Sequence, residues 1–214
     1  MNMKYHLYIN RLRRVVSLGL LLAVCCASFV ACSDEENKTL ENQQTKLLSF
    51  VTSTLGLRSY EEANDPSSEV SNANFYTVTG NTAYRWITNY YDADREQRKL
   101  VERGSVVELT LSMYEFNFKK ITNKTLPFFT NDVEMKSMLE DSGLNTEFWS
   151  FEPYRITVGE TDTIKGLAQS LEGCREGDIV ELYMTYTMGY GGDWVYVVTP
   201  DSPLAILFTV DKVE

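Results

Sequence analysis

No apolar run in this sequence reaches the length of about 20 residues that a membrane-spanning helix needs. The apolar stretch near the N-terminus, Val15–Val24, is short, and small residues follow it. Basic residues precede it, namely Lys4, Arg11, Arg13 and Arg14. A short apolar core with basic residues before it and small residues after it is typical of a cleaved signal peptide. We therefore predict that residues 1–31 are a signal rather than an N-terminal membrane anchor.

Histidine and cysteine are scarce in the remaining chain. The one histidine, His6, lies within the predicted signal, and Cys174 is the one cysteine after Cys32. Without histidine the domain cannot activate a nucleophile through a Ser-His or Cys-His pair. It also lacks the commonest zinc ligand and a thiolate cluster, so we expect no metal and no cofactor. Cys174 is expected to be a small buried apolar residue.

Positive charge is also in short supply. The chain carries 20 basic and 30 acidic residues, and the predicted signal holds four of the basic ones and none of the acidic ones. Removing residues 1–31 therefore leaves a net charge of −14. A phosphate backbone would repel such a surface, which excludes nucleic acid as an expected partner. The remaining possible functions are chemistry by carboxylate side chains, binding without catalysis, and a reaction that needs no side chain to donate or accept a proton.

The residues around Cys32 resemble a known processing site. Val30, Ala31 and Cys32 are similar to the lipobox of bacterial lipoproteins, in which cleavage precedes a lipid-bearing cysteine. Cys25 and Cys26 are rival sites, but cleavage there would leave apolar residues at the new N-terminus. The acidic run 33–36 resembles the export signal of surface lipoproteins in Bacteroidetes, although a solvated linker also favours charge. The resemblance implies an outer-membrane lipoprotein anchored through Cys32 and facing the periplasm or the cell surface.

The rest of the chain predicts a tether followed by an α+β domain. Residues 32–46 are polar and indicate a tether, and 47–102 an extension with a short helix over 46–57 and a hairpin over 75–88. Alternating apolar and polar residues predict strands over 106–116, 178–186 and 204–210. One helix is expected over 164–171, with Asp162 as its cap and Gly173 at its end. The acidic stretch 92–96 is read as a solvated turn rather than a calcium loop, because it lacks the central glycine and terminal glutamate.

The last 112 residues, 103–214, carry an ordered set of motifs. They begin with Arg103-Gly104 before a strand and continue with Phe128-Phe129-Thr130-Asn131. Segment 153–191 then runs without a gap through a strand, a helix and a Gly-Tyr-Gly loop, and a phenylalanine-containing strand closes the set. In this order they resemble the FKBP-type peptidyl-prolyl cis-trans isomerase family. The resemblance implies a curved antiparallel sheet wrapped around one short helix, preceded here by the N-terminal extension.

The same resemblance implies an apolar pocket between the helix and the sheet. The catalytic positions would be Tyr154, Tyr190 and Phe208. The substrate-binding positions would be Phe128, Phe129, Thr163, Ile164 and Leu167. Two positions depart from the family pattern, because Phe129 stands in place of an aspartate and Leu167 in place of a tryptophan. The chain also has an insert of about twenty residues, Asp132 to Phe151, which we expect to form a helix and a flap beside the pocket, and an aromatic loop over 192–198.

Two functions follow from the resemblance. The first is a prolyl isomerase that acts on proline-containing peptides or unfolded envelope proteins. The second is a non-catalytic module that binds peptides or envelope proteins through the same aromatic pocket. The departures at Phe129 and Leu167 favour the second function, whereas Tyr190 and the apolar lining favour the first. Without the resemblance, Phe208 and Ile164 would be read as ordinary core residues.

Overall fold

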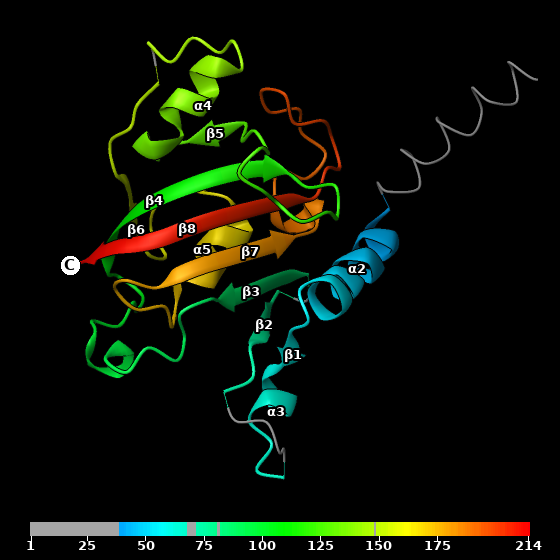
Figure 1. Cartoon of the computed structure of the whole chain (residues 1–214), viewed down its shortest axis with the longest axis vertical. Helices are drawn as coiled ribbons and strands as arrows, with labels where there is room; N and C mark the ends of the chain where they lie inside the picture. Colours follow the sequence, from blue (N-terminus) through cyan, green and yellow to red (C-terminus); the bar gives the residue numbers. More distant parts are fainter. Residues whose placement is uncertain (1–38, 68–71, 81, 148) are drawn as a thin grey trace, which may run out of the picture.

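The structure, a computed structural model, describes residues 39–67, 72–80, 82–147 and 149–214. The predicted signal and Cys32 lie outside the described residues. No described helix combines the length and the apolar character needed to cross a membrane. One eight-stranded sheet organises the fold (Figure 1), with β6 paired to β4 beside the path β1-β2-β3-β7-β8-β4-β5. Its strands are β1 Arg58–Ser59, β2 Phe75–Thr79, β3 Ala83–Ile87, β4 Val106–Glu115, β5 Phe129–Thr130, β6 Tyr154–Thr157, β7 Ile179–Met184 and β8 Leu204–Val213.

Short helices surround this sheet. Two of them start the described chain, α2 at Leu40–Ser49 and a π-helical turn, η1, at Phe50–Thr54. The others are α3 Tyr60–Ala63, η2 Arg95–Gln97, η3 Val133–Met135, α4 Lys136–Asp141, α5 Lys165–Leu171 and η4 Tyr186–Met188. The predicted α+β class with a curved, mainly antiparallel sheet is confirmed, and so is the expected helix in the insert. The pair β1–β2 is parallel.

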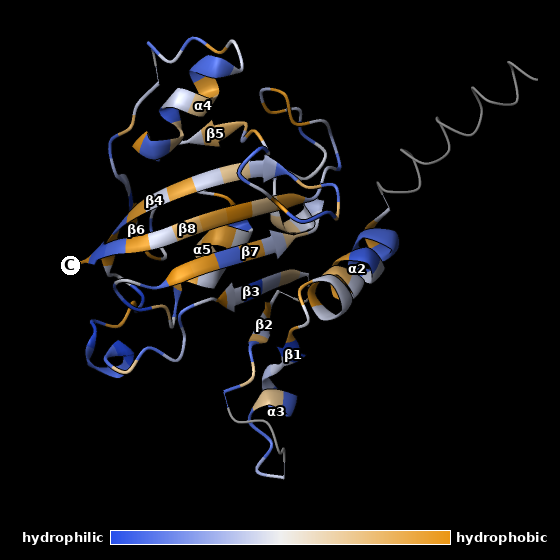
Figure 2. Ribbon diagram, viewed as in Figure 1, coloured by the Kyte–Doolittle hydropathy of each residue, from blue (hydrophilic) through white to orange (hydrophobic). Residues whose placement is uncertain are grey.

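The two ten-residue strands β4 and β8 form the centre of the sheet. They pair antiparallel, with Leu111 opposite Phe208 and Met113 opposite Ile206. Their alternate apolar residues face α5 and are almost fully buried, as the period of two predicted. Figure 2 shows β7 and β8 as mainly hydrophobic and the loop between β3 and β4 as mainly hydrophilic. The three strands that the alternation predicted are therefore confirmed.

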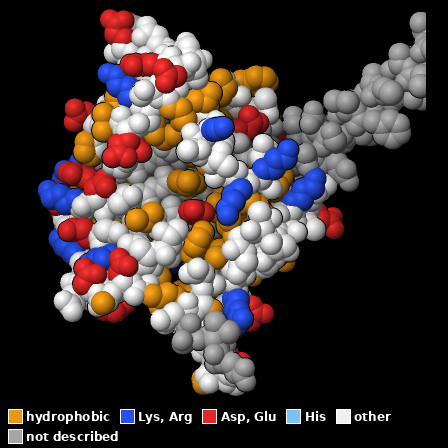
Figure 3. Space-filling model, in the orientation of Figure 1, with side chains coloured by type: hydrophobic (Ala, Val, Ile, Leu, Met, Phe, Trp, Pro, Cys, Tyr) orange, Lys and Arg blue, Asp and Glu red, His pale blue; other side chains and the backbone are white. Residues whose placement is uncertain are grey.

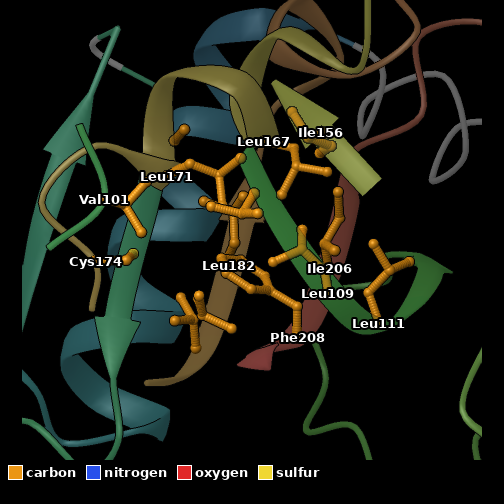
Figure 4. Packing of buried hydrophobic residues seen from close by; sticks show 14 of the residues in the cluster. Val101, Leu109, Leu111, Ile156, Leu167, Leu171, Cys174, Leu182, Ile206 and Phe208 are labelled. Carbon is orange, nitrogen blue, oxygen red and sulfur yellow. The ribbon is translucent and has the colours of Figure 1, made fainter. Parts of the chain in front are cut away.

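Helix α5 covers one face of the sheet and completes the main core. Leu167 and Leu171 are fully buried and pack with strand residues such as Leu182 and Phe208 (Figure 4). Gly166 permits this close approach, because a Cβ there would lie 2.5 Å from the Met184 sulfur. The predicted cap at Asp162 is wrong. The N-cap is Ile164, which leaves Asp162 two residues too early to reach the first backbone N–H groups.

The start of the described chain covers part of the opposite face of the sheet. The ring of Phe50 meets Phe116 and Tyr183 edge-on, with centroids 4.9 Å from each. Helix α2 begins at Leu40 rather than at the predicted Lys46, so the predicted tether of 32–46 is wrong over its last seven residues. The helix starts earlier than predicted because Gln43, a polar residue, is fully buried in the fold. Its amide donates to the Asp201 carbonyl at 2.7 Å and accepts from the Tyr186 N–H at 2.9 Å.

The N-terminal extension belongs to the same sheet as the rest of the chain. The predicted hairpin is confirmed as the antiparallel pair β2–β3. Strand β3 pairs in turn with β7, from Ala83 opposite Met184 to Ile87 opposite Val180. Backbone hydrogen bonds of this kind satisfy polar groups that would otherwise be exposed at the edge of β7. The extension is thus an integral part of the sheet.

Cys174 is expected to resist alkylation in the folded protein. Its side chain is fully buried, and burial raises the pKa of the thiol to about 11. At pH 8 about one thiol in a thousand would therefore be the reactive thiolate, and that fraction is shielded from solvent. Iodoacetamide labelling followed by peptide mass spectrometry should find Cys174 unmodified at pH 8 and modified after unfolding in urea. Rapid labelling of the folded chain would contradict this assignment.

Candidate functional site

An aromatic hollow of about 310 Å³ opens beside the insert. It is lined by Phe128, Phe129, Thr130, Trp149, Ser150 and Tyr196. These residues come from three segments: β5 with the residue before it, the end of the insert, and the loop that follows η4. Figure 3 shows a band of hydrophobic side chains on the surface beside α4. None of the six lining residues carries a charge, so the hollow suits an apolar ligand. We refer to it below as the aromatic hollow.

Asn131 fixes the segment that supplies the two phenylalanines. Its side-chain oxygen accepts the Leu111 N–H at 2.7 Å, and its side-chain nitrogen donates to the carbonyls of Leu109 and Glu152 at 2.8 and 3.0 Å. The Phe128 N–H also donates to the Met113 carbonyl at 2.9 Å. A buried side chain with all these bonds holds one rotamer and one backbone position. Asn131 therefore ties β5, β4 and the end of the insert together around the aromatic hollow.

The structure brings five of the predicted site residues together. Phe128 packs against Tyr190 and Phe129 against Tyr154, each pair with ring centroids 6.2 Å apart. The Tyr154 hydroxyl lies 3.3 Å from the hydroxyl of Thr163, just before α5. These separations are within the range of favourable aromatic contacts. Ile164 is half-buried at the start of α5 and packs against the core.

Leu167 and Phe208 do not line the aromatic hollow. Leu167 is 0% exposed and Phe208 is 3% exposed, and both contribute to the core between α5 and the sheet (Figure 4). Both belong to the main core cluster, where Gly166 allows α5 to approach Met184 on β7 closely. Their assignment as substrate-contacting residues stays a prediction.

Three lining residues outside the predicted set come from the insert and the aromatic loop. Trp149 and Ser150 lie near the end of the insert, and Tyr196 lies in the loop over 192–198. Tyr196 is 81% exposed and has a positive φ of 54°, in a tight turn closed by the bridge between Val195 and Val198. The Trp194 indole donates to the Tyr196 carbonyl at 2.9 Å. In the sequence, the many aromatic residues of the insert and of this loop were the feature that indicated a role for both segments near the site.

Tyr190 stays protonated at neutral pH. Burial raises the pKa of the half-buried Tyr190, and neighbouring Tyr154 and Tyr196 raise it further. Its hydroxyl is therefore available as a hydrogen-bond donor. Among the described residues, no group of three or more histidine, cysteine, aspartate or glutamate side chains is arranged to hold a metal ion. The residues that line or adjoin the aromatic hollow offer aromatic surface and hydroxyl groups.

Comparison with known proteins agrees with the family resemblance. Residues 130–211 match the family described as FKBP-type peptidyl-prolyl cis-trans isomerase, which confirms an FKBP-type domain in this chain. No curated protein sequence matches the chain. Similar solved structures include the N-terminal domain of FKBP42 from Arabidopsis thaliana, at 12% identity and a TM-score of 0.44, over 69% of this chain and 96% of that one. The three FKBP domains of wheat FKBP73 match at 12% identity and a TM-score of 0.46, over 66% of this chain and 51% of that one.

Proposed function

We propose that this chain, which carries an FKBP-type peptidyl-prolyl isomerase domain, binds proline-containing segments of envelope proteins in the aromatic hollow and accelerates their cis–trans rotation. The observation that carries this proposal is the lining itself. Four of its six residues are aromatic and none is charged. A pyrrolidine ring is a compact apolar group, and it would gain dispersion and hydrophobic contact against such rings.

Rotation about the X-Pro bond suits a site of this composition. The barrier of about 18–20 kcal/mol comes from amide resonance, which is lost when the bond twists. The twisted amide has less charge separation than either planar isomer, so an apolar environment favours it relative to both. No nucleophile, base or metal is required. The chain's lack of histidine after residue 6 is therefore no obstacle to this reaction.

Tyr190 is the proposed hydrogen-bond donor to the peptide. It is half-buried and packs on Phe128, which lines the aromatic hollow. Its raised pKa keeps the hydroxyl protonated over the whole neutral range. A hydroxyl donor beside an apolar surface would hold one carbonyl group of the bound peptide in place while the X-Pro amide bond rotates. Tyr190 would thus orient the substrate rather than transfer a proton.

A second function, binding without catalysis, is favoured by two specific features. Phe129 stands where the family pattern has an aspartate, which removes a polar side chain from the site. Leu167 stands where the pattern has a tryptophan, and it is fully buried beneath the surface. A site of this kind would still attract apolar peptides. It would have fewer polar groups with which to favour the twisted amide over the planar forms.

A protease-coupled isomerisation assay on the full chain separates the two functions. Peptides with leucine, phenylalanine or alanine before proline would be tested, and binding would be followed by tryptophan fluorescence. Isomerase function predicts acceleration that saturates with peptide concentration. Saturable binding without any acceleration would establish the non-catalytic module. Neither binding nor acceleration would remove both proposals.

We further propose that the domain is held at the outer membrane through a lipid on Cys32. Only residues 33–39 separate Cys32 from the first residue of α2. Seven residues span at most about 25 Å even when fully extended. Such an anchor would keep the aromatic hollow close to the membrane, where envelope proteins emerge and fold.

A further inference from the structure

A second hollow, of about 300 Å³, lies at the other end of α5. Its walls come from α3, from β2 and β3, from the loop before β4, and from the turn after α5. Nine of its eleven lining residues precede residue 130, outside the segment that matches the family. The aromatic hollow lies toward the start of α5 and this one at its C-terminal turn, next to Gly173. We refer to it as the arginine hollow.

Three arginines line the arginine hollow, and two of them are neutralised. The guanidinium of Arg95 meets the Asp178 carboxylate at 2.7 Å, and that of Arg175 meets the Glu96 carboxylate at 2.7 Å. Glu96 is the one acidic residue in the lining. Arg85 makes no ion pair within the described part of the chain. The hollow therefore keeps one uncompensated positive charge, in a chain whose net charge is −10.

Arg85 has a structural role that leaves part of its side chain unused. Its Nη1 donates to the carbonyls of Ser170 and Glu172 at 2.7 and 2.8 Å, which caps the C-terminal end of α5. Its Nε donates to the Thr77 hydroxyl at 3.2 Å. Its Nη2 has no hydrogen-bond partner among the described residues. Nη2 lies beside Gly173, which also lines the hollow, because a Cβ built on Gly173 would be 4.0 Å from it.

The wall of the arginine hollow includes a group of aromatic rings. Phe75 lies between Tyr60 and Tyr90, with edge-to-face centroid distances of 5.3 and 4.7 Å. One side of the hollow is thus aromatic, while the other presents the free edge of a guanidinium. Guanidinium groups bind carboxylates through short, charge-assisted hydrogen bonds. The volume is at the lower end of the range for small-molecule sites.

From these features we infer that the arginine hollow binds a small carboxylate that carries an aromatic or aliphatic group. The carboxylate accepts from Nη2 of Arg85, and the apolar body lies against Phe75 and Tyr90. Arg85 keeps its contacts with α5 while it binds, because these use Nη1. The ligand supplies the missing counter-charge. This inference does not depend on isomerase activity, because the site lies at the opposite end of α5 from the aromatic hollow.

Calorimetric titration of the full chain with N-acetylphenylalanine tests this inference. We expect saturable binding with one site per chain, and at least tenfold weaker binding of the uncharged N-acetylphenylalaninamide, because a charge-assisted hydrogen bond is lost. Arg85→Gln should weaken binding of the acid about tenfold or more. Arg155→Gln is the matched control, since Arg155 lies on β6 in an exposed ion pair with Glu108. It should bind the acid as the unaltered chain does.

A second variant covers the case in which Arg85→Gln fails to fold. Leu100 lies on the rim and is 38% exposed, so Leu100→Trp should fill the hollow without disturbing the core. It is expected to abolish binding of N-acetylphenylalanine at an unchanged melting temperature. Three results would overturn the inference: no saturable binding, equal binding of acid and amide, or binding that survives in Leu100→Trp.

Discussion

Replacing Arg95 by alanine is expected to destabilise the fold by about 3–5 kcal/mol, the usual cost of leaving a buried charge without its partner. The Arg95 guanidinium donates two hydrogen bonds to the Asp178 carboxylate, from Nε at 2.8 Å and from Nη2 at 2.7 Å. The side chains are 4% and 0% exposed. Asp178 could not regain water after the substitution. The free energy of unfolding would be measured by urea denaturation followed by circular dichroism.

Two further variants test this explanation. Arg155→Ala removes an exposed arginine whose carboxylate partners are also partly exposed, and it should cost less than about 1 kcal/mol. The double substitution of Arg95→Met with Asp178→Leu replaces both charges by apolar groups and should recover most of the lost stability. If Arg95→Ala unfolds at the same urea concentration as Arg155→Ala, the ion pair does not stabilise the fold as we argue.

Replacing Phe128 by alanine is expected to lower kcat/KM for prolyl isomerisation about tenfold or more. Phe128 lines the aromatic hollow and also supports Tyr190, so the substitution removes apolar contact and loosens the proposed donor. Loss of the contact of one aromatic side chain is worth about 1.5–3 kcal/mol, which corresponds to at least tenfold in rate. The rate would be measured with a peptide that has leucine before proline.

The matched control for this prediction is Phe118→Ala. Phe118 is also half-buried, but it packs against Phe116 on the opposite face of the sheet, with ring centroids 5.4 Å apart. The same chemical change at that position should leave kcat/KM within about twofold of the original value, as expected of a residue remote from the site. Equal losses in the two variants would indicate a general effect on folding rather than a role in the aromatic hollow.

The strands and the main core could be predicted from the sequence because their pattern is local. Alternation along β4, β7 and β8 reports directly which side chains face α5. The hairpin of the extension was predictable for the same reason, because a two- or three-residue turn separates its strands. What the alternation could not show is that β3 joins the edge of β7. That pairing connects residues about one hundred positions apart.

The errors have physical causes in particular residues. Gln43 made the start of α2 look like a tether, because burial of a polar side chain depends on backbone partners at Asp201 and Tyr186 that no local pattern reveals. Arg95 lay in a stretch that reads as solvated, yet it is buried against Asp178. Charged residues are rarely buried unless paired, and the pair here is 83 positions apart.

The candidate site was predicted in part. Five family-derived positions do come together at or beside the aromatic hollow, because they lie on β5, β6, the start of α5 and the glycine-flanked loop. Trp149 and Tyr196 lie in an insert and a loop, where no periodicity shows which way a side chain points. The many aromatic residues in the insert and in this loop indicated that both segments lie near the site. Their exact positions in its wall required the structure.

The most direct test of the central claim is to find where a proline-containing peptide binds. Transferred nuclear Overhauser effects between the proline ring of a Leu-Pro peptide and the aromatic protons of the chain would be measured for the unaltered protein, Phe128→Ala and Phe118→Ala. Binding in the aromatic hollow predicts contacts that include the Trp149 indole, are lost in Phe128→Ala and persist in Phe118→Ala. Contacts that persist in Phe128→Ala, or that never involve Trp149, would contradict the account.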